Sequence, residues 1–134
     1  KEQSDQGLIE VEQRDGKVFV TVGSGGAFPS GTADLTGEAQ RIMDRIALTA
    51  MSPDSSITVT GHTDDVPISN GQFRDNWDLG AGRAASVVQA IQSTGLISGD
   101  RLSAVSKGEM VPVADNNTAA GRKQNRRIEI EISY

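Results

Sequence analysis

Asp64 and Arg83 are the charged residues whose spacing most suggests a binding site. Asp64 follows the alternating segment 57–60, and Arg83 lies early in a predicted helix, with Asn76 in the loop between them. A carboxylate and a guanidinium that converge at one loop can hold a zwitterion, because the first accepts an ammonium and the second binds a carboxylate. Without further evidence, the two side chains of such a pair are more often solvated or bound to each other.

His62 is the single histidine, so a catalytic triad would have to be built around it. The chain contains no Gly-x-Ser-x-Gly segment, and a histidine here more commonly donates a hydrogen bond that shapes the loop. Asp64 and Asp65 are adjacent, and loop geometry usually points neighbouring side chains apart. A glycosidase instead needs two carboxyl groups about 5 to 10 Å apart around a sugar. Hydrolysis is therefore not the favoured interpretation.

Composition argues against several other kinds of site. Cysteine is absent, and there is neither a histidine pair nor an Asp-x-Asp-x-Asp-Gly run, so we expect no metal site and no disulfide. The formal net charge of −5 disfavours contact with a phosphate backbone. We expect neither a cofactor nor a nucleic-acid partner.

Two further features allow a functional and a structural interpretation. The basic residues Arg122, Lys123, Arg126 and Arg127 could bind a polyanion, but cations at the end of a helix are commonly structural. Trp77 could stack on a sugar, yet a lone tryptophan at a helix start more often packs against its own loop. The structural interpretation is favoured for both.

Hydrophobic periodicity predicts the elements that position these residues. Strands are predicted at 9–13, 17–22, 57–60, 102–107 and 127–133, and helices at 36–50, 78–94 and 118–125. Asp15-Gly16 favours a hairpin between the first two strands, and 23–31 is predicted to be a glycine-rich connection. The order is βαβαβαβ with a leading hairpin, which predicts an α+β fold, or α/β sandwich, with helices on one face of a mixed sheet. Right-handed crossovers make the first strand connections parallel.

A chain of 134 residues fits a single domain. We predict a flexible tether at residues 1–7 and one domain over residues 8–134. The apolar stretches are only a few residues long, far short of the roughly 20 needed to span a bilayer. No membrane-spanning segment is expected within this sequence.

An ordered set of motifs resembles the OmpA-like peptidoglycan-binding domain and spans nearly the whole chain. Its parts are Gly61-His62-Thr63-Asp64, Asn76-x-x-Leu79, Arg83-Ala84, Arg101-Leu102, Gly108, Asn117, Arg122 and Asn125-Arg126-Arg127-Ile128-Glu129-Ile130. Each part alone is weak, but their order is highly specific.

Three segments are more similar to flagellar stator proteins of the MotB/PomB type than to other members of that family. They are Phe28 to Leu35, Asp65-Val66-Pro67-Ile68 and Asn76-Trp77-Asp78-Leu79. The segment Gly80-Ala81-Gly82 departs from the family, in which a serine and fewer glycines are usual before Arg-Ala. This departure puts the rigidity of the helix start in question.

The resemblance implies a non-catalytic periplasmic domain that binds the stem peptide of peptidoglycan and anchors a stator to the cell wall. Asp64 and Arg83 would hold the zwitterionic centre of diaminopimelate. The pocket would be completed by Thr63, Asn76, Leu79 and the backbone of Pro29 to Gly31. His62, Arg126 and Arg127 would be structural, with Asn125-Arg126-Arg127 fixing the last strand to the adjoining loop.

The resemblance also implies partners. A homodimer is expected, and in the full-length protein an amino-terminal membrane helix absent from this chain would pair with a MotA/PomA-type channel subunit. Two alternatives stay open: the anchor of an outer-membrane porin or lipoprotein, and a cell-wall hydrolase that uses Asp64 and Asp65.

Overall fold

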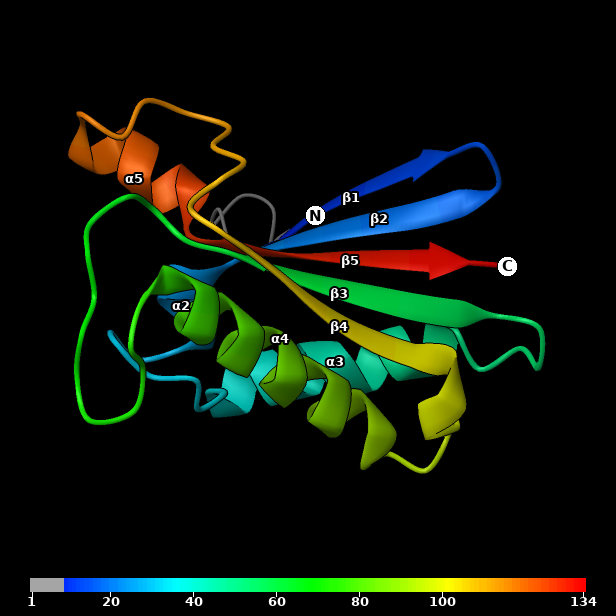
Figure 1. Cartoon of the computed structure of the whole chain (residues 1–134). Coiled ribbons are helices and arrows are strands. Elements are labelled where there is room, and N and C mark those ends of the chain that lie inside the picture. The colour runs from blue at the N-terminus through cyan, green and yellow to red at the C-terminus, as the bar shows by residue number, and fades with distance from the viewer. Residues whose placement is uncertain (1–8) are drawn as a thin grey trace.

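A five-stranded mixed sheet carries helices on one face in the computed structural model, which describes residues 9–134 (Figure 1). This confirms the predicted fold class. The strands are β1 Ile9–Arg14, β2 Lys17–Gly23, β3 Ser56–His62, β4 Leu102–Gly108 and β5 Arg127–Ser133. The helices are α2 Ser24–Ala27, α3 Gly37–Thr49, α4 Asn76–Gln92 and α5 Ala119–Asn125, with the 3₁₀ turn η1 Gly99–Arg101. The predicted tether at residues 1–7 lies outside the described residues.

The last strand of the chain lies in the centre of the sheet, whose strand order is β1-β2-β5-β3-β4. β5 is antiparallel to both β2 and β3, whereas β3 and β4 are parallel. β2 and β3 therefore run in the same direction, as the crossover rule predicts, but β5 separates them. The start of β5 consequently lies beside the end of β3, where Arg127 is opposite His62.

The turn between β1 and β2 forms at the predicted Asp-Gly pair. Asp15 and Gly16 both adopt positive φ angles, 53° and 75°. Two successive residues in this region suit a tight hairpin turn, because its backbone twist matches that of the flanking strands.

Side-chain caps fix the starts of α3, α4 and α5. Thr118 caps α5 by accepting a hydrogen bond from the Gly121 N–H at 2.9 Å. Thr36 caps α3 by accepting a hydrogen bond from the Ala39 N–H at 3.2 Å. Asp75 caps α4 through the Asp78 N–H at 2.9 Å, so the helix begins two residues before the predicted position and includes Asn76.

The segment predicted to be a glycine-rich connection contains the short helix α2. Its first N–H, on Ser24, donates to the Arg126 carbonyl at 2.9 Å, and Ala27 and Phe28 after it are buried. The local prediction failed here because contacts with distant parts of the chain, rather than helix propensity, stabilise this turn.

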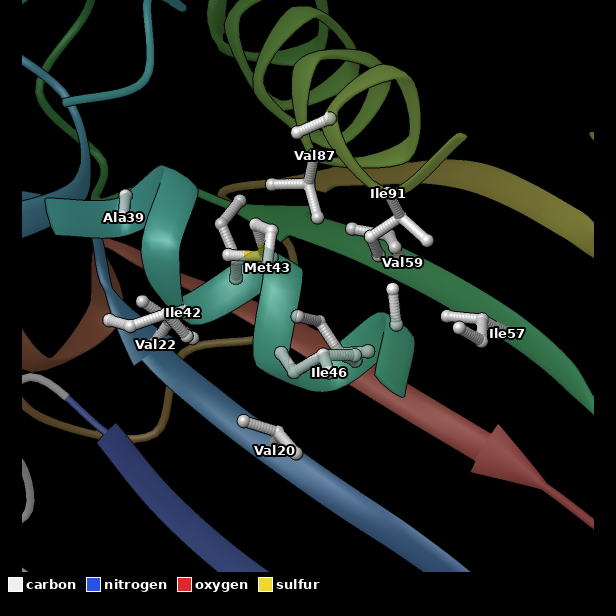
Figure 2. Close-up of a cluster of buried hydrophobic side chains, with 14 of the residues drawn as sticks. Val20, Val22, Ala39, Ile42, Met43, Ile46, Ile57, Val59, Val87 and Ile91 are labelled. Carbon is white, nitrogen blue, oxygen red and sulfur yellow. The ribbon is translucent and has the colours of Figure 1, made fainter. Parts of the chain in front are cut away.

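The core lies between the sheet and the pair α3 and α4 (Figure 2). Every second residue of the central strands faces the helices, including Val20, Ile57, Val59, Ile128 and Ile130. The helices meet this face with Ile42, Met43 and Ile46 from α3, and with Val87 and Ile91 from α4. This alternation is that of strands with one face buried against helices.

Glycines allow α4 to lie close against β3. A Cβ atom on Gly61 would lie 2.1 Å from the Gly80 carbonyl oxygen, and one on Gly80 would lie 2.5 Å from the Ser106 Oγ. A Cβ on Gly82 would lie 2.9 Å from the Phe73 ring. The segment Gly80-Ala81-Gly82 therefore creates a tight helix-to-sheet contact at the helix start, which a larger residue would obstruct.

Candidate functional site

The candidate site lies where β3 ends, α4 begins and α5 leads into β5. Asp64 follows β3 by two residues, and Arg83 lies in the third turn of α4. Both are buried, with 8% of Asp64 and 4% of Arg83 exposed. Burial of two opposite charges at one place is costly unless each is paired or hydrogen-bonded, so their partners decide what the site can do.

Asp64 forms its ion pair with Arg126. The Arg126 Nη1 lies 2.7 Å from the Asp64 Oδ2, and the Val66 N–H donates to Oδ1 at 3.0 Å. We expected Arg126 to tie the last strand to a loop and did not predict this contact. The sequence gives no local signal for it, because it follows from β5 lying antiparallel beside β3.

Arg83 is held by backbone carbonyls and an aromatic ring. Its Nε donates to the Thr32 carbonyl at 2.7 Å, its Nη2 lies 3.5 Å from the Pro29 carbonyl, and its guanidinium lies over the Phe28 ring at 4.9 Å. Burial and repulsion from Arg126 lower the pKa of Arg83 to about 10, while attraction from Asp64 opposes this shift. The carbonyls of Pro29 and Thr32 thus contact the Arg83 side chain.

Two of the predicted lining residues hold the Asp64 loop. The Asn76 amide nitrogen donates to the carbonyls of Asp64 at 3.3 Å and Val66 at 3.1 Å, and to the Glu109 Oε1 at 3.1 Å. The Thr63 hydroxyl donates to the Asp64 carbonyl at 2.8 Å. Leu79, the third, is buried in the first turn of α4.

His62 belongs to a separate polar cluster beside the site. Its Nε2 lies 3.0 Å from the Glu129 Oε1, and the Arg127 Nε donates to the Glu129 Oε2 at 2.9 Å. The hydrogen bond with His62, supported by Arg127 and opposed by burial, lowers the pKa of Glu129 to about 2. Arg127 also donates to the carbonyls of Asn125 and Val111. This cluster joins β3, β5 and the loop after β4.

Asn125 fixes the loop that precedes α5. It is fully buried, and its Oδ1 accepts from the N–H groups of Val113 at 2.7 Å and Ala114 at 2.9 Å. Its Nδ2 donates to the Ala114 carbonyl and to the Asn116 Oδ1. These contacts set the position of Arg126, the next residue.

The remaining candidate residues are Trp77, Arg122 and Lys123. Trp77 is 48% exposed, and its ring lies over Gly108, with Cδ2 3.4 Å from the position of a Cβ there. Arg122 donates to the Asn116 carbonyl at 2.9 Å, whereas Lys123 is exposed. The basic residues therefore do not act as one patch.

Residues 9–134 contain neither a candidate metal site nor a candidate membrane-spanning helix. No group of three or more histidine, cysteine, aspartate or glutamate side chains there could hold a metal ion. Within the same residues, every helix is too short or too polar to cross a bilayer.

A family model decides the relationship of this chain to known proteins. The model described as the OmpA family matches residues 27–126, which include Asp64, Arg83 and the predicted pocket residues Thr63, Asn76 and Leu79. The chain belongs to the OmpA family. Motility protein B of Bacillus subtilis (strain 168) is 33% identical over 125 residues, covering 92% of this chain and 48% of the relative. The chain thus spans about half the length of that protein.

Two solved structures share this fold. The cell wall anchor of the T6SS from Pseudomonas aeruginosa superimposes with a TM-score of 0.90 at 31% identity, covering 98% of this chain and 92% of that one. The periplasmic domain of Helicobacter pylori MotB gives a TM-score of 0.83 at 27% identity, covering 93% of this chain and 81% of that one.

Proposed function

We propose that this OmpA-family domain is a non-catalytic, periplasmic anchor that binds peptidoglycan and holds a flagellar stator to the cell wall. The observation that carries the proposal is the burial of Asp64 and Arg83 at one loop cluster, with the Asp64 loop held by Thr63 and Asn76. Similarity to Motility protein B and to the MotB periplasmic domain supports the stator assignment.

The ligand we propose is the zwitterionic centre of diaminopimelate in the stem peptide. Asp64 would accept the ammonium, and Arg83, whose Nη1 has no hydrogen bond to residues 9–134, would donate to the carboxylate. Both carboxylate oxygens of Asp64 already accept hydrogen bonds, from Arg126 and from the Val66 N–H, so neither is free to act on a glycosidic bond. This supports binding over hydrolysis.

The partners belong to the same proposal. A homodimer would present two wall-binding sites, and in the full-length protein a MotA/PomA-type channel subunit would pair with a membrane helix preceding this domain. A second candidate role is the cell-wall anchor of a secretion machine, because the T6SS anchor superimposes over nearly all of both chains. Loss of motility, rather than of secretion, on deletion of the gene would support the stator role.

Cosedimentation with purified sacculi tests the binding function. We expect the wild-type domain to pellet, and Asp64→Asn and Arg83→Met to lose at least tenfold in affinity, because a hydrogen bond to a charged group is worth about 1.5 to 3 kcal/mol. Asp65→Asn removes the charge of an exposed neighbour and should bind as the wild type does. Circular dichroism would establish that all four proteins are folded. Failure of the wild type to pellet, or release of soluble muropeptides, would refute the proposal.

A further inference from the structure

We infer that Arg126 is a third charged residue of the binding site, and that it makes the site select a carboxylate over an ammonium. The inference rests on the proposed function and specifies the ligand chemistry of the same site. The contacts of Arg126, its exposure and the charge balance around Arg83 carry it.

Arg126 is the most accessible charged side chain of the three. Its side chain is 39% exposed, whereas the Asp64 side chain to which it is bound is 11% exposed and Arg83 is 4% exposed as a residue. A ligand that approaches the buried pair from solvent therefore meets the Arg126 guanidinium.

The site holds two guanidinium groups and one carboxylate. Asp64 is already bound to Arg126, and no ion pair joins Arg83 to a carboxylate of residues 9–134. Glu109 is hydrogen-bonded to Asn76 on the other side of the Asp64 loop and is not among the groups that shift the pKa of Arg83. An anion would complete the charge balance.

The two guanidinium groups also keep unused donors. Arg126 uses Nη1 for Asp64, and its Nε and Nη2 have no hydrogen bond to any residue in 9–134. The Nη1 of Arg83 is likewise free within that range. Planar guanidinium groups bind carboxylates through paired N–H donors, so a carboxylate can bind here without breaking an existing contact.

An ammonium meets a different situation. Asp64 already has a cation at 2.7 Å, so an ammonium must share this carboxylate with Arg126 or displace it. Partial loss of the ion pair with Arg126 removes charge compensation from the buried Asp64 side chain, whereas addition of a carboxylate leaves this ion pair intact. The site should therefore discriminate mainly through the carboxylate of the stem peptide. A wall in which this carboxylate is amidated should bind more weakly.

Three small molecules with the same seven-carbon chain separate the contribution of the carboxylate from that of the ammonium. Meso-diaminopimelate carries both groups, heptanedioate carries only carboxylates, and 1,7-diaminoheptane carries only ammonium groups. Binding to the wild-type domain is followed by amide chemical-shift changes in NMR titrations. We expect meso-diaminopimelate and heptanedioate to bind, and diaminoheptane to bind at least tenfold more weakly, in line with the strength of one charged hydrogen bond.

Variants of Arg126 then assign the selectivity. Arg126→Gln should weaken heptanedioate by about tenfold or more and should strengthen diaminoheptane, because Asp64 is released. Arg126→Lys keeps the charge and should keep the preference for heptanedioate, even if Arg126→Gln does not fold. Lys123→Gln removes an exposed cation from α5 and should match the wild type.

The outcomes separate this inference from the proposed function. If the wild type binds neither sacculi nor meso-diaminopimelate, the proposed function fails and the inference with it. If the wild type binds both, the inference alone is overturned when diaminoheptane binds as tightly as heptanedioate, when heptanedioate does not bind, or when folded Arg126→Gln leaves the preference unchanged. The reversed preference in Arg126→Gln would establish it.

Discussion

Asp64 has a hydrogen-bond donor on each carboxylate oxygen before any ligand binds. Arg126 lies on one oxygen and the Val66 N–H on the other, while Thr63 and Asn76 bind the Asp64 carbonyl. The carboxylate is thus oriented by contacts from three parts of the chain. Such preorganisation lowers the entropic cost of ligand binding, because the site does not have to become ordered.

Glu129 should give the domain a measurable dependence of stability on acid. Its pKa is lowered to about 2 by His62 and Arg127, so its contribution to the free energy of unfolding is present above the ordinary glutamate pKa and is lost as the pH falls through about 2. Because the Glu129 side chain is 44% exposed, solvent screening limits this contribution to about 1 kcal/mol.

Urea unfolding between pH 7 and pH 2 measures this contribution. Glu129→Gln should be less stable than the wild type near neutral pH, and the difference should shrink toward pH 2. Glu38→Gln, at an exposed position in the first turn of α3, is the control and should not show the same convergence. An acid dependence of Glu129→Gln identical to that of the wild type would refute the assignment.

The site residues differed in how well the sequence predicted them. Asp64, Arg83, Thr63 and Asn76 form one cluster because each belongs to a motif tied to the end of a strand or the start of a helix. The ion pair of Arg126 was missed because the residue is distant in sequence, and only the strand order brings it to Asp64. Contacts that depend on which strands become neighbours are not visible in local periodicity.

Close glycine contacts fix the position of helix α4, and of the site residues that it carries, relative to β3. Gly80 lies against Gly61 and Ser106, and Asn76 and Arg83 lie on either side of it in the helix. Helix propensity alone would favour alanine over glycine at position 80 by about 1 kcal/mol. Packing predicts the opposite effect, because a Cβ there would lie 2.5 Å from the Ser106 Oγ and 3.0 Å from the Gly61 carbonyl oxygen.

Substitution of Gly80 therefore separates propensity from packing. We expect Gly80→Ala to lower the free energy of unfolding by about 1 to 3 kcal/mol, as overpacked cores do, and to weaken wall binding by shifting Asn76 and Arg83. Gly71→Ala adds a Cβ that meets nothing within 4 Å and should leave stability nearly unchanged. A more stable Gly80→Ala protein in thermal unfolding would show that the helix can move away from the strand at little cost.

The boundaries of the helices show where local signals suffice. The strand β5 has the predicted bounds, and Thr36 and Thr118 cap α3 and α5. The predicted start of α4 was two residues too late, because Asp75, rather than a later residue, provides the cap. The fold class was predictable because alternation and helical spacing are strong in the buried segments, whereas α2 depends on distant contacts.

The proposed function gives the whole domain one wall-binding site per chain, so the strength of an anchor should depend on how many sites act together. Joining two domains makes the second binding event intramolecular, which can raise apparent affinity by about 10² to 10⁴ when both sites can reach the wall. The proposed homodimer would use this effect without any new contact to the ligand.

A dimer fused through an amino-terminal coiled coil tests this prediction. Two wild-type arms should pellet with sacculi at a much lower protein concentration than a single domain. A mixed dimer in which one arm carries Asp64→Asn should bind only as well as the single domain. Equal binding by both dimers would show that the gain does not come from two occupied sites.

The central position of β5 also determines the order in which the domain can form. The five strands cannot join into one sheet until Arg127–Ser133 lies between β2 and β3, and these residues are synthesised after all the other strands. Before then, the hairpin β1-β2 and the pair β3-β4 are separate, and Arg126 cannot reach Asp64. A nascent chain should therefore lack the complete proposed binding site until β5 has been made and has taken its place in the sheet.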